Sequence, residues 1–306
     1  MRLHSAFAYC LACLAVVTSV SCGGAGHGDS MPSSSFFATQ KGTSSAGPFV
    51  IYKRDDKGNS PTQITDSAAN YSAPDYSPTK KMFVFVGLDP VTNKLNLYTL
   101  NPTDSAPQLH TQTSFNHHNP RFSPDGNWIV FSEDQATVGN SEIYKVPSEG
   151  GVTVETALTE AAGLNSFPSV GFDNQTVVFS STLQGGSNYQ IYTVPLQGGA
   201  IKRVRVDGQS YAYPSFVQSD SSIYCSMITA AGTANIVSLP ANGQAPSAVT
   251  TSVAGTFDAH PRLVEGNIAF DRTIGSATQV YLKHASSGEV NLSLSTGVLW
   301  EAIQTD

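Results

Sequence analysis

Apolar and polar positions along the chain repeat in a cycle of short strands. Each cycle opens at a proline and passes through a polar run into an apolar strand. It continues into an Ile/Val-Tyr strand and closes in a Gly-rich turn. The intervals between successive prolines are 46, 48, 46 and 47 residues. A fixed period in the forties built only from strands predicts β-propeller blades. The prolines are Pro74, Pro120, Pro168, Pro214 and Pro261.

The clearest copy reads NPRFSPDGNWIVFSEDQ (119–135), followed by SEIYKVPSEGG (141–151). Its Ser-Pro-Asp-Gly run (123–126) predicts a tight turn, because glycine tolerates positive φ and aspartate bonds to nearby amides. Apolar runs on both sides of this turn predict the strands of one four-stranded antiparallel blade. Those strands are expected at Phe122 and at residues 128–132, 143–146 and 152–158.

One further copy lies upstream of the first proline and lacks its first strand. Residues 35–40, 49–53 and 63–65 predict its remaining strands, and residues 297–304 are the candidate for the missing one. Pairing the two ends of the chain would remove two exposed sheet edges, which otherwise invite aggregation. We therefore expect an all-β, six-bladed β-propeller over residues 35–306, with the first blade closed by the C-terminal strand.

These repeats resemble the PD40, or WD40-like, propeller repeat of TolB. The pattern PxFSPDGxxIxF…IYxxxxxGG is complete at residues 120–151, and the resemblance covers about residues 34–304. Related repeats occur in TolB, in peptidase propellers and in polysaccharide lyases. TolB also has a separate α/β domain before its propeller, for which this chain has no room. The resemblance thus implies a fold and leaves the function open.

The N-terminus has the features of a targeting segment. Arg2 supplies a positive charge, and residues 6–20 form an apolar run too short to span a membrane comfortably. Cys22 follows a small residue and precedes two glycines, which resembles a bacterial lipobox, although Ser19 stands where leucine is usual. The alternative is an ordinary signal peptide cut nearby. We expect a lipoprotein signal peptide at residues 1–21, lipidation of Cys22 and a flexible tether at residues 22–34.

Composition narrows the set of partners. Charged residues make up 13% of the chain, the formal net charge is −7 and no basic run occurs, so nucleic acid is not an expected partner. After removal of the signal peptide and lipidation of Cys22, Cys225 is the remaining thiol. It lies on an apolar strand and is expected to be a small core residue.

Motif searches give no catalytic residue. The chain contains no Gly-x-Ser-x-Gly, P-loop, dinucleotide fingerprint or EF-hand loop. His117, His118 and His260 lie within three residues before a repeat proline. Metal sites need three or more ligands, and only His118 and His260, which belong to non-adjacent blades, are plausible ligands here. We therefore expect no metal and no cofactor.

The best candidate for a binding site is the mouth of the central channel. Residues beside the repeat prolines should converge there, because each proline marks the entry to the innermost strand of a blade. A ring of His, Asn, Tyr and Arg side chains could hold an anionic or sugar ligand. The candidate residues are His118, Asn119, Arg121, Tyr213, His260 and Arg262.

Two functions are consistent with this pattern. The favoured one is a non-enzymatic, monomeric binding module for a cell-envelope protein or polysaccharide. It would be exported to the periplasm or cell surface and held to a membrane only by its lipid anchor. The alternative is a carbohydrate-active or metal-dependent lyase with its site at the channel mouth. Several histidines around a divalent metal would favour the lyase, whereas an exposed apolar patch beside a polar channel would favour the binding module.

Overall fold

Every regular element in the described part of the chain is a β-strand. The computed structural model describes residues 15–17, 35–41, 49–55, 62–66, 70–101, 104–152, 154–183, 186, 188–216, 222–251, 253–264, 267–275, 277–284, 288–291 and 302–304. The predicted lipidation site Cys22 and the tether at residues 22–34 lie outside these ranges. Within the described residues, the search for an apolar helix of membrane-spanning length finds none.

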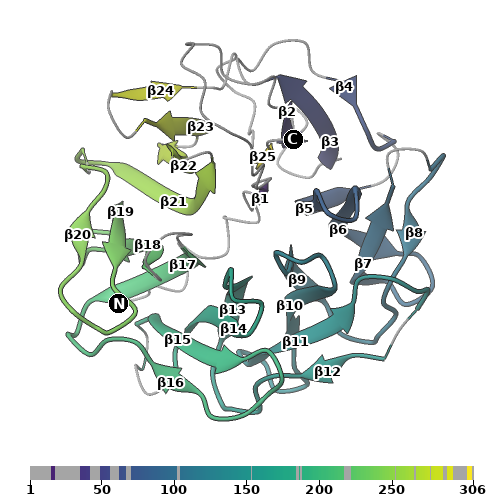
Figure 1. Cartoon of the computed structure of the whole chain (residues 1–306), viewed down its shortest axis with the longest axis horizontal. Helices are drawn as coiled ribbons and strands as arrows, with labels where there is room; N and C mark the ends of the chain where they lie inside the picture. Colours follow the sequence, from purple (N-terminus) through teal and green to yellow (C-terminus); the bar gives the residue numbers. More distant parts are fainter. Residues whose placement is uncertain are drawn as a thin grey trace.

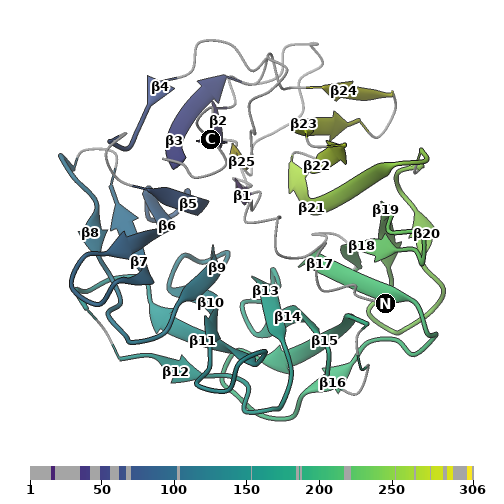
Figure 2. The ribbon, with the colours of Figure 1, turned by 180° about the vertical axis from the view of Figure 1, so that it is seen from behind.

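Antiparallel sheets are arranged radially around a common centre and follow one another in chain order (Figures 1 and 2). Three of them form separate four-stranded blades, with the first strand of each nearest the centre (Figure 1). Their strands are β5 (Tyr71–Ser77), β6 (Met82–Asp89), β7 (Lys94–Leu100) and β8 (Gln108–Leu109); β9 (His117–Phe122), β10 (Trp128–Asp134), β11 (Ser141–Pro147) and β12 (Thr156–Ala157); and β13 (Asn165–Val170), β14 (Thr176–Ser181), β15 (Gln190–Pro195) and β16 (Lys202–Arg203).

The next two blades are joined into one eight-stranded sheet by a single parallel bridge between Ala234 and Phe257. Apart from this bridge, each of them repeats the same four-stranded antiparallel order. The predicted all-β architecture of four-stranded antiparallel blades is thereby confirmed. The strands are β17 (Ser210–Phe216), β18 (Ile223–Ile228), β19 (Ala234–Leu239) and β20 (Ser247–Ala248); and β21 (Thr256–Val264), β22 (Asn267–Ile274), β23 (Ala277–Lys283) and β24 (Glu289–Asn291).

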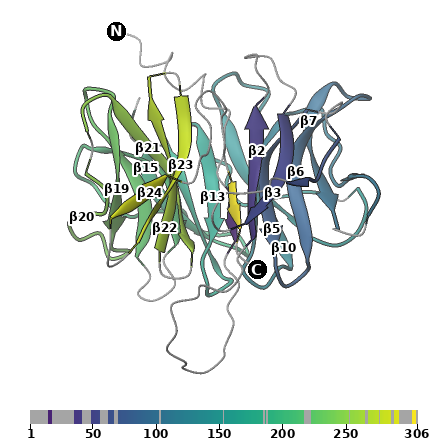
Figure 3. The same cartoon turned by 90° about the horizontal axis from the view of Figure 1, so that it is seen from above.

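The first sheet has three strands, β2 (Ser35–Lys41), β3 (Phe49–Asp55) and β4 (Thr62–Gln63). The C-terminal strand β25 (Ala302–Gln304) lies close to β2 (Figure 3), but its hydrogen-bonded partner is the parallel strand β1 (Ala15–Val17). The predicted ladder between the C-terminal strand and the first blade is therefore not formed here, because β25 pairs with a strand from the predicted signal peptide. The count of six blades and the closure stay predictions.

A pair of stacked aromatic rings recurs in the core from blade to blade. The second strand of a blade contributes a fully buried phenylalanine, and the third strand contributes a tyrosine 5.8 to 6.5 Å away between ring centroids. In one blade Cys225 takes the phenylalanine position and is fully buried, which raises the pKa of its thiol. The ring pairs are Phe85–Tyr98, Phe131–Tyr144, Phe179–Tyr192 and Phe270–Tyr281.

A threonine hydroxyl extends the ladder where the short outermost strand ends. Several of the outermost strands, such as β8 and β12, are only two residues long. The threonine two residues beyond the outermost strand accepts a hydrogen bond from a backbone N–H of the third strand. This buried N–H is therefore paired although the outermost strand has already ended. These bonds are Ile51 N to Thr65 at 3.0 Å, and Leu97 N to Thr111, Ile143 N to Thr159 and Ile236 N to Thr250, each at 2.9 Å.

Candidate binding site at the channel mouth

The innermost strand of each complete blade has a β-bulge at its repeat proline. The register of β5, β9, β13, β17 and β21 shifts at this point. The residue before the proline has a φ of 51° to 57°, which is uncommon for residues other than glycine. Bulges redirect side chains, and such strained backbone tends to lie at functional sites. The five residues are Ala73, Asn119, Phe167, Tyr213 and His260.

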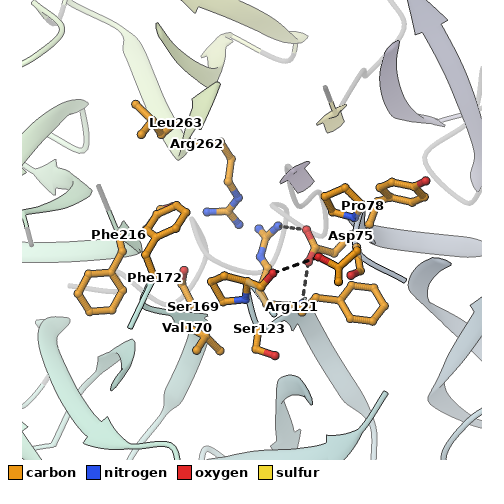
Figure 4. A pocket seen from close by; sticks show the side chains of 16 residues that line it. Asp75, Pro78, Arg121, Ser123, Ser169, Val170, Phe172, Phe216, Arg262 and Leu263 are labelled. Carbon is orange, nitrogen blue, oxygen red and sulfur yellow. Dashed lines mark hydrogen bonds and ion pairs between the residues drawn. The ribbon is translucent and has the colours of Figure 1, made fainter. Parts of the chain in front are cut away.

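A cavity of about 430 Å³ opens where the residues that follow the prolines converge (Figure 4). Arg121 and Arg262 come from different blades and extend toward the middle of this cavity, while Phe172 and Phe216 form part of one wall (Figure 4). The five residues directly after the prolines all line it, as the sequence pattern suggests. They are Asp75, Arg121, Ser169, Ser215 and Arg262.

The cavity brings together two arginines and one buried aspartate. Arg121 Nη1 lies 3.2 Å from Asp75 Oδ1, and the backbone N–H of Phe122 donates to Asp75 Oδ2 at 2.8 Å. Burial raises the pKa of Asp75 to about 6, although Arg121 and the backbone N–H groups act in the opposite direction. Arg262 Nη1 donates to the carbonyl of Pro261 at 3.0 Å. Guanidinium groups recognise carboxylates and phosphates through paired hydrogen bonds, so this lining is chemically suited to an anionic ligand.

The residues before the prolines meet in a second, smaller pocket beside the first. Asn119, Phe167, Tyr213 and His260 line it together with Arg121 and Arg262. The Tyr213 and His260 rings lie 4.2 Å apart between centroids, and the Phe167 and Tyr213 rings 4.4 Å apart. Five of the six candidate residues from the sequence are therefore neighbours in space.

His118 is the exception. It lies before the bulge on β9, and its Nε2 is 3.2 Å from Asp134 Oδ1 on β10, with both side chains partly exposed. It lines neither of the two described channel pockets. The reversal of side-chain direction along a strand, together with the bulge after it, separates His118 from its neighbours Asn119 and Arg121.

His260 is held by a carboxylate that the sequence did not single out. Its Nδ1 lies 2.9 Å from Asp271 Oδ2, and both side chains are almost fully buried. Burial, assisted by the charge of Arg121, lowers the pKa of His260 to about 3, and burial raises the pKa of Asp271 well above its usual value. Both shifts favour the uncharged forms of the two side chains. Among the described residues, His260 Nε2 has no hydrogen-bond partner.

A sequence signal for Asp271 does exist. In the second strand of three other blades, the residue that follows the buried phenylalanine or cysteine is serine. In the last blade this position holds Asp271 instead. Such a change of residue type at a repeated position marks a local function. The serines are Ser132, Ser180 and Ser226.

The fold and the converging side chains define a β-propeller with a polar pocket at its channel. The family described as the TolB beta propeller domain (PD40) matches residues 33–297, and the chain belongs to this family.

Solved structures support the same fold. TolB from Acinetobacter baumannii is 19% identical with a TM-score of 0.70, over 88% of this chain and 67% of that chain. A TolB-type protein from Agrobacterium tumefaciens is 18% identical with a TM-score of 0.65, over 86% of this chain and 90% of that one. Hydrazine synthase from Kuenenia stuttgartiensis is 13% identical with a TM-score of 0.74, over 89% of this chain and 46% of that one. At these identities the likeness concerns the fold alone.

Proposed function

We propose that this protein is a non-enzymatic binding module of the cell envelope that takes an anionic group of its partner at the channel mouth. The observation that carries the proposal is the cavity to which separate blades contribute Arg121 and Arg262, with phenylalanines on one wall. Planar guanidinium groups bind carboxylates in two-point contacts, and aromatic walls supply contact area to a protein or sugar. An acidic protein segment and an acidic polysaccharide both have this chemistry.

The chemistry of His260 supports binding over lyase catalysis. A general base must accept a proton during the reaction, and a pKa of about 3 makes the imidazolium of His260 costly at neutral pH. His118, the second histidine of the lyase hypothesis, lies elsewhere and faces Asp134. The pair on which a channel-mouth metal was considered is therefore not assembled among the described residues.

Capture from solubilised envelopes tests the binding site. The purified protein is expected to retain a partner or an acidic polysaccharide, and Arg262→Gln combined with Arg121→Gln is expected to weaken that binding by about tenfold or more, since buried arginines dominate such contacts. Lys202→Gln combined with Lys283→Gln removes the same charge on strands β16 and β23 and should leave binding unchanged. Equal binding by both folded double variants would contradict the proposal.

We further propose that the protein is exported and tethered to a membrane through Cys22, as the N-terminal pattern suggests. Cys22→Ser is expected to move the protein from the membrane fraction to the soluble fraction in detergent partitioning, because acylation of this cysteine is the attachment that the sequence offers. Cys225→Ser is the matched control and should stay with the membrane, since the Cys225 thiol is buried in the core. If the Cys22→Ser variant still partitions with membranes, the proposed lipid anchor at Cys22 is wrong.

The proposal includes a monomeric six-bladed ring. Removal of residues 1–21 as a signal peptide would take away β1, which is the hydrogen-bonded partner of β25. Since β25 already lies close to β2, it would then be placed to add the fourth strand to the first blade.

A further inference from the structure

A second cluster of chemically reactive side chains lies within the blade formed by β9 to β12. It consists of His117 on β9, Glu133 on β10 and Glu155, which directly precedes β12. None of the three lines either of the described channel pockets. We propose that His117, Glu133 and Glu155 form a binding site for one divalent transition-metal ion that joins the outer strand of this blade to its two inner strands.

The distances suit a shared ion. His117 Nε2 lies 2.9 Å from Glu133 Oε2 and 3.2 Å from Glu155 Oε1, and all three ligand atoms lie within 4.8 Å of one another. Bonds of about 2.0–2.1 Å in a tetrahedral site place neighbouring ligand atoms about 3.3 Å apart. An ion can therefore be accommodated after small side-chain movements. The imidazole is already oriented, since its Nδ1 lies 2.9 Å from the Thr111 hydroxyl.

The protein alone leaves this cluster incompletely paired. The side chains of His117, Glu133 and Glu155 are 0%, 5% and 9% exposed. His117 Nε2 can carry only one hydrogen, and its hydrogen-bond partners are Glu133 at 2.9 Å and the Thr113 hydroxyl at 3.1 Å. Glu155 Oε1 is consequently buried without a hydrogen-bond partner while it faces the cluster. A buried carboxylate oxygen without a partner is costly, and a cation would satisfy it.

In the last blade, an arginine side chain lies at the place equivalent to this cluster. Asp258 lies three residues before its proline, as His117 does, and pairs across the sheet with Arg272, as His117 pairs with Glu133. Glu289 takes the place of Glu155 at the start of the outer strand. Arg272 donates to Asp258 at 2.6 and 2.7 Å and to Glu289 at 2.5 Å.

In the blade of β9 to β12, a glutamate replaces that arginine. The guanidinium between two carboxylates is thus exchanged for two carboxylates and an imidazole. No lysine or arginine of the described chain forms an ion pair with Glu133 or Glu155. Burial and the neighbouring Glu133 raise the pKa of Glu155 to about 9. A divalent ion would supply the positive charge that Arg272 provides in the last blade. One imidazole and two carboxylates are ligands that Zn²⁺ and Mn²⁺ accept, and the Thr113 hydroxyl lies 3.1 Å from His117 Nε2.

Equilibrium dialysis of the metal-stripped full chain against MnCl₂ tests the site. Mn²⁺ is the first probe because the thiols of Cys10, Cys13 and Cys22 compete for Zn²⁺. One Mn²⁺ per chain is expected, together with a melting temperature that rises with Mn²⁺ concentration. Glu155→Gln keeps the shape of the side chain and removes one ligand charge, so it should weaken Mn²⁺ binding by about tenfold or more and abolish the rise in melting temperature.

Glu160→Gln is the matched control, because Glu160 is exposed in the same blade. It should bind Mn²⁺ as the unchanged protein does. His117→Asn should reproduce the loss seen with Glu155→Gln. The proposal is overturned if the unchanged protein binds no stoichiometric Mn²⁺ or Zn²⁺, or if Glu155→Gln and His117→Asn, while folded, bind as tightly as the Glu160→Gln control.

Discussion

Replacing Asp258 by alanine is expected to lower the free energy of unfolding by about 3–5 kcal/mol, the usual effect of breaking a buried ion pair. Asp258 is fully buried, accepts two hydrogen bonds from Arg272 and a third from Thr250 at 2.7 Å. Its loss would leave a buried guanidinium with only Glu289 as a charged partner. Urea unfolding followed by tryptophan fluorescence measures the effect.

Two control variants test whether the loss of stability in Asp258→Ala comes from the burial of its ion pair or from the loss of a charge alone. Glu149 forms an ion pair with Lys80 at 2.6 Å but is 73% exposed, so Glu149→Ala should cost less than about 1 kcal/mol. Asp258→Ala combined with Arg272→Met should recover much of the loss, because no unpaired buried charge remains. Similar losses for Asp258→Ala and Glu149→Ala would show that the buried pair does not stabilise this blade.

Deleting residues 299–306 is expected to lower the stability of the whole domain by several kcal/mol. In the proposed closed ring, this segment adds the missing strand to the first blade, and its sequence supplies the apolar residues Leu299, Trp300 and Ile303. Burial of each such side chain contributes about 1.5–3 kcal/mol. The deletion would also expose the edge of β2 and open the ring between the first and last blades.

Differential scanning calorimetry of the chain that begins at Cys22 measures this effect. Deletion of Thr305 and Asp306 alone is the control, because these residues lie beyond β25. The control should melt with the unchanged protein and the longer deletion well below it. Closure by the C-terminal strand is wrong if both deletions melt at the temperature of the unchanged protein.

The sequence predicts a strand accurately where that strand has a hydrogen-bonded neighbour along both of its edges. The second strand expected at residues 128–132 is found at Trp128–Asp134, and the turn before it is closed by the N–H of Gly126 donating to Ser123. The fourth strand expected at residues 152–158 is only Thr156–Ala157. An outermost strand has a partner on one edge only, so its length depends on that partner rather than on its own apolar run.

The sequence predicts residues of the site only where the repeat of the blades brings equivalent positions together. Asn119 and His260 converge because they hold the equivalent position before the proline in different blades, and Arg121 and Arg262 do so at the position after it. The place of His118 depends on side-chain direction, which a single sequence does not reveal, and the contact between Asp271 and His260 depends on cross-strand register, although the departure from serine at Asp271 is visible in the sequence. The same holds for His117, whose glutamate neighbours lie 16 and 38 positions further along the chain. The left-handed backbone before each proline was also hidden, since residues in that position usually adopt extended conformations.

The bulge before each proline has a consequence for how this ring could acquire new ligands. One backbone shape carries a methyl group, an amide, two aromatic rings and an imidazole at equivalent places in five blades. The shape recurs whatever side chain it bears, so folding places little demand on the chemistry of that side chain. Asn119, Phe167, Tyr213 and His260, each from a different blade, therefore contribute contacts of different chemistry to one channel pocket. Specificity in such a ring can be rewritten one position at a time, with the scaffold unchanged.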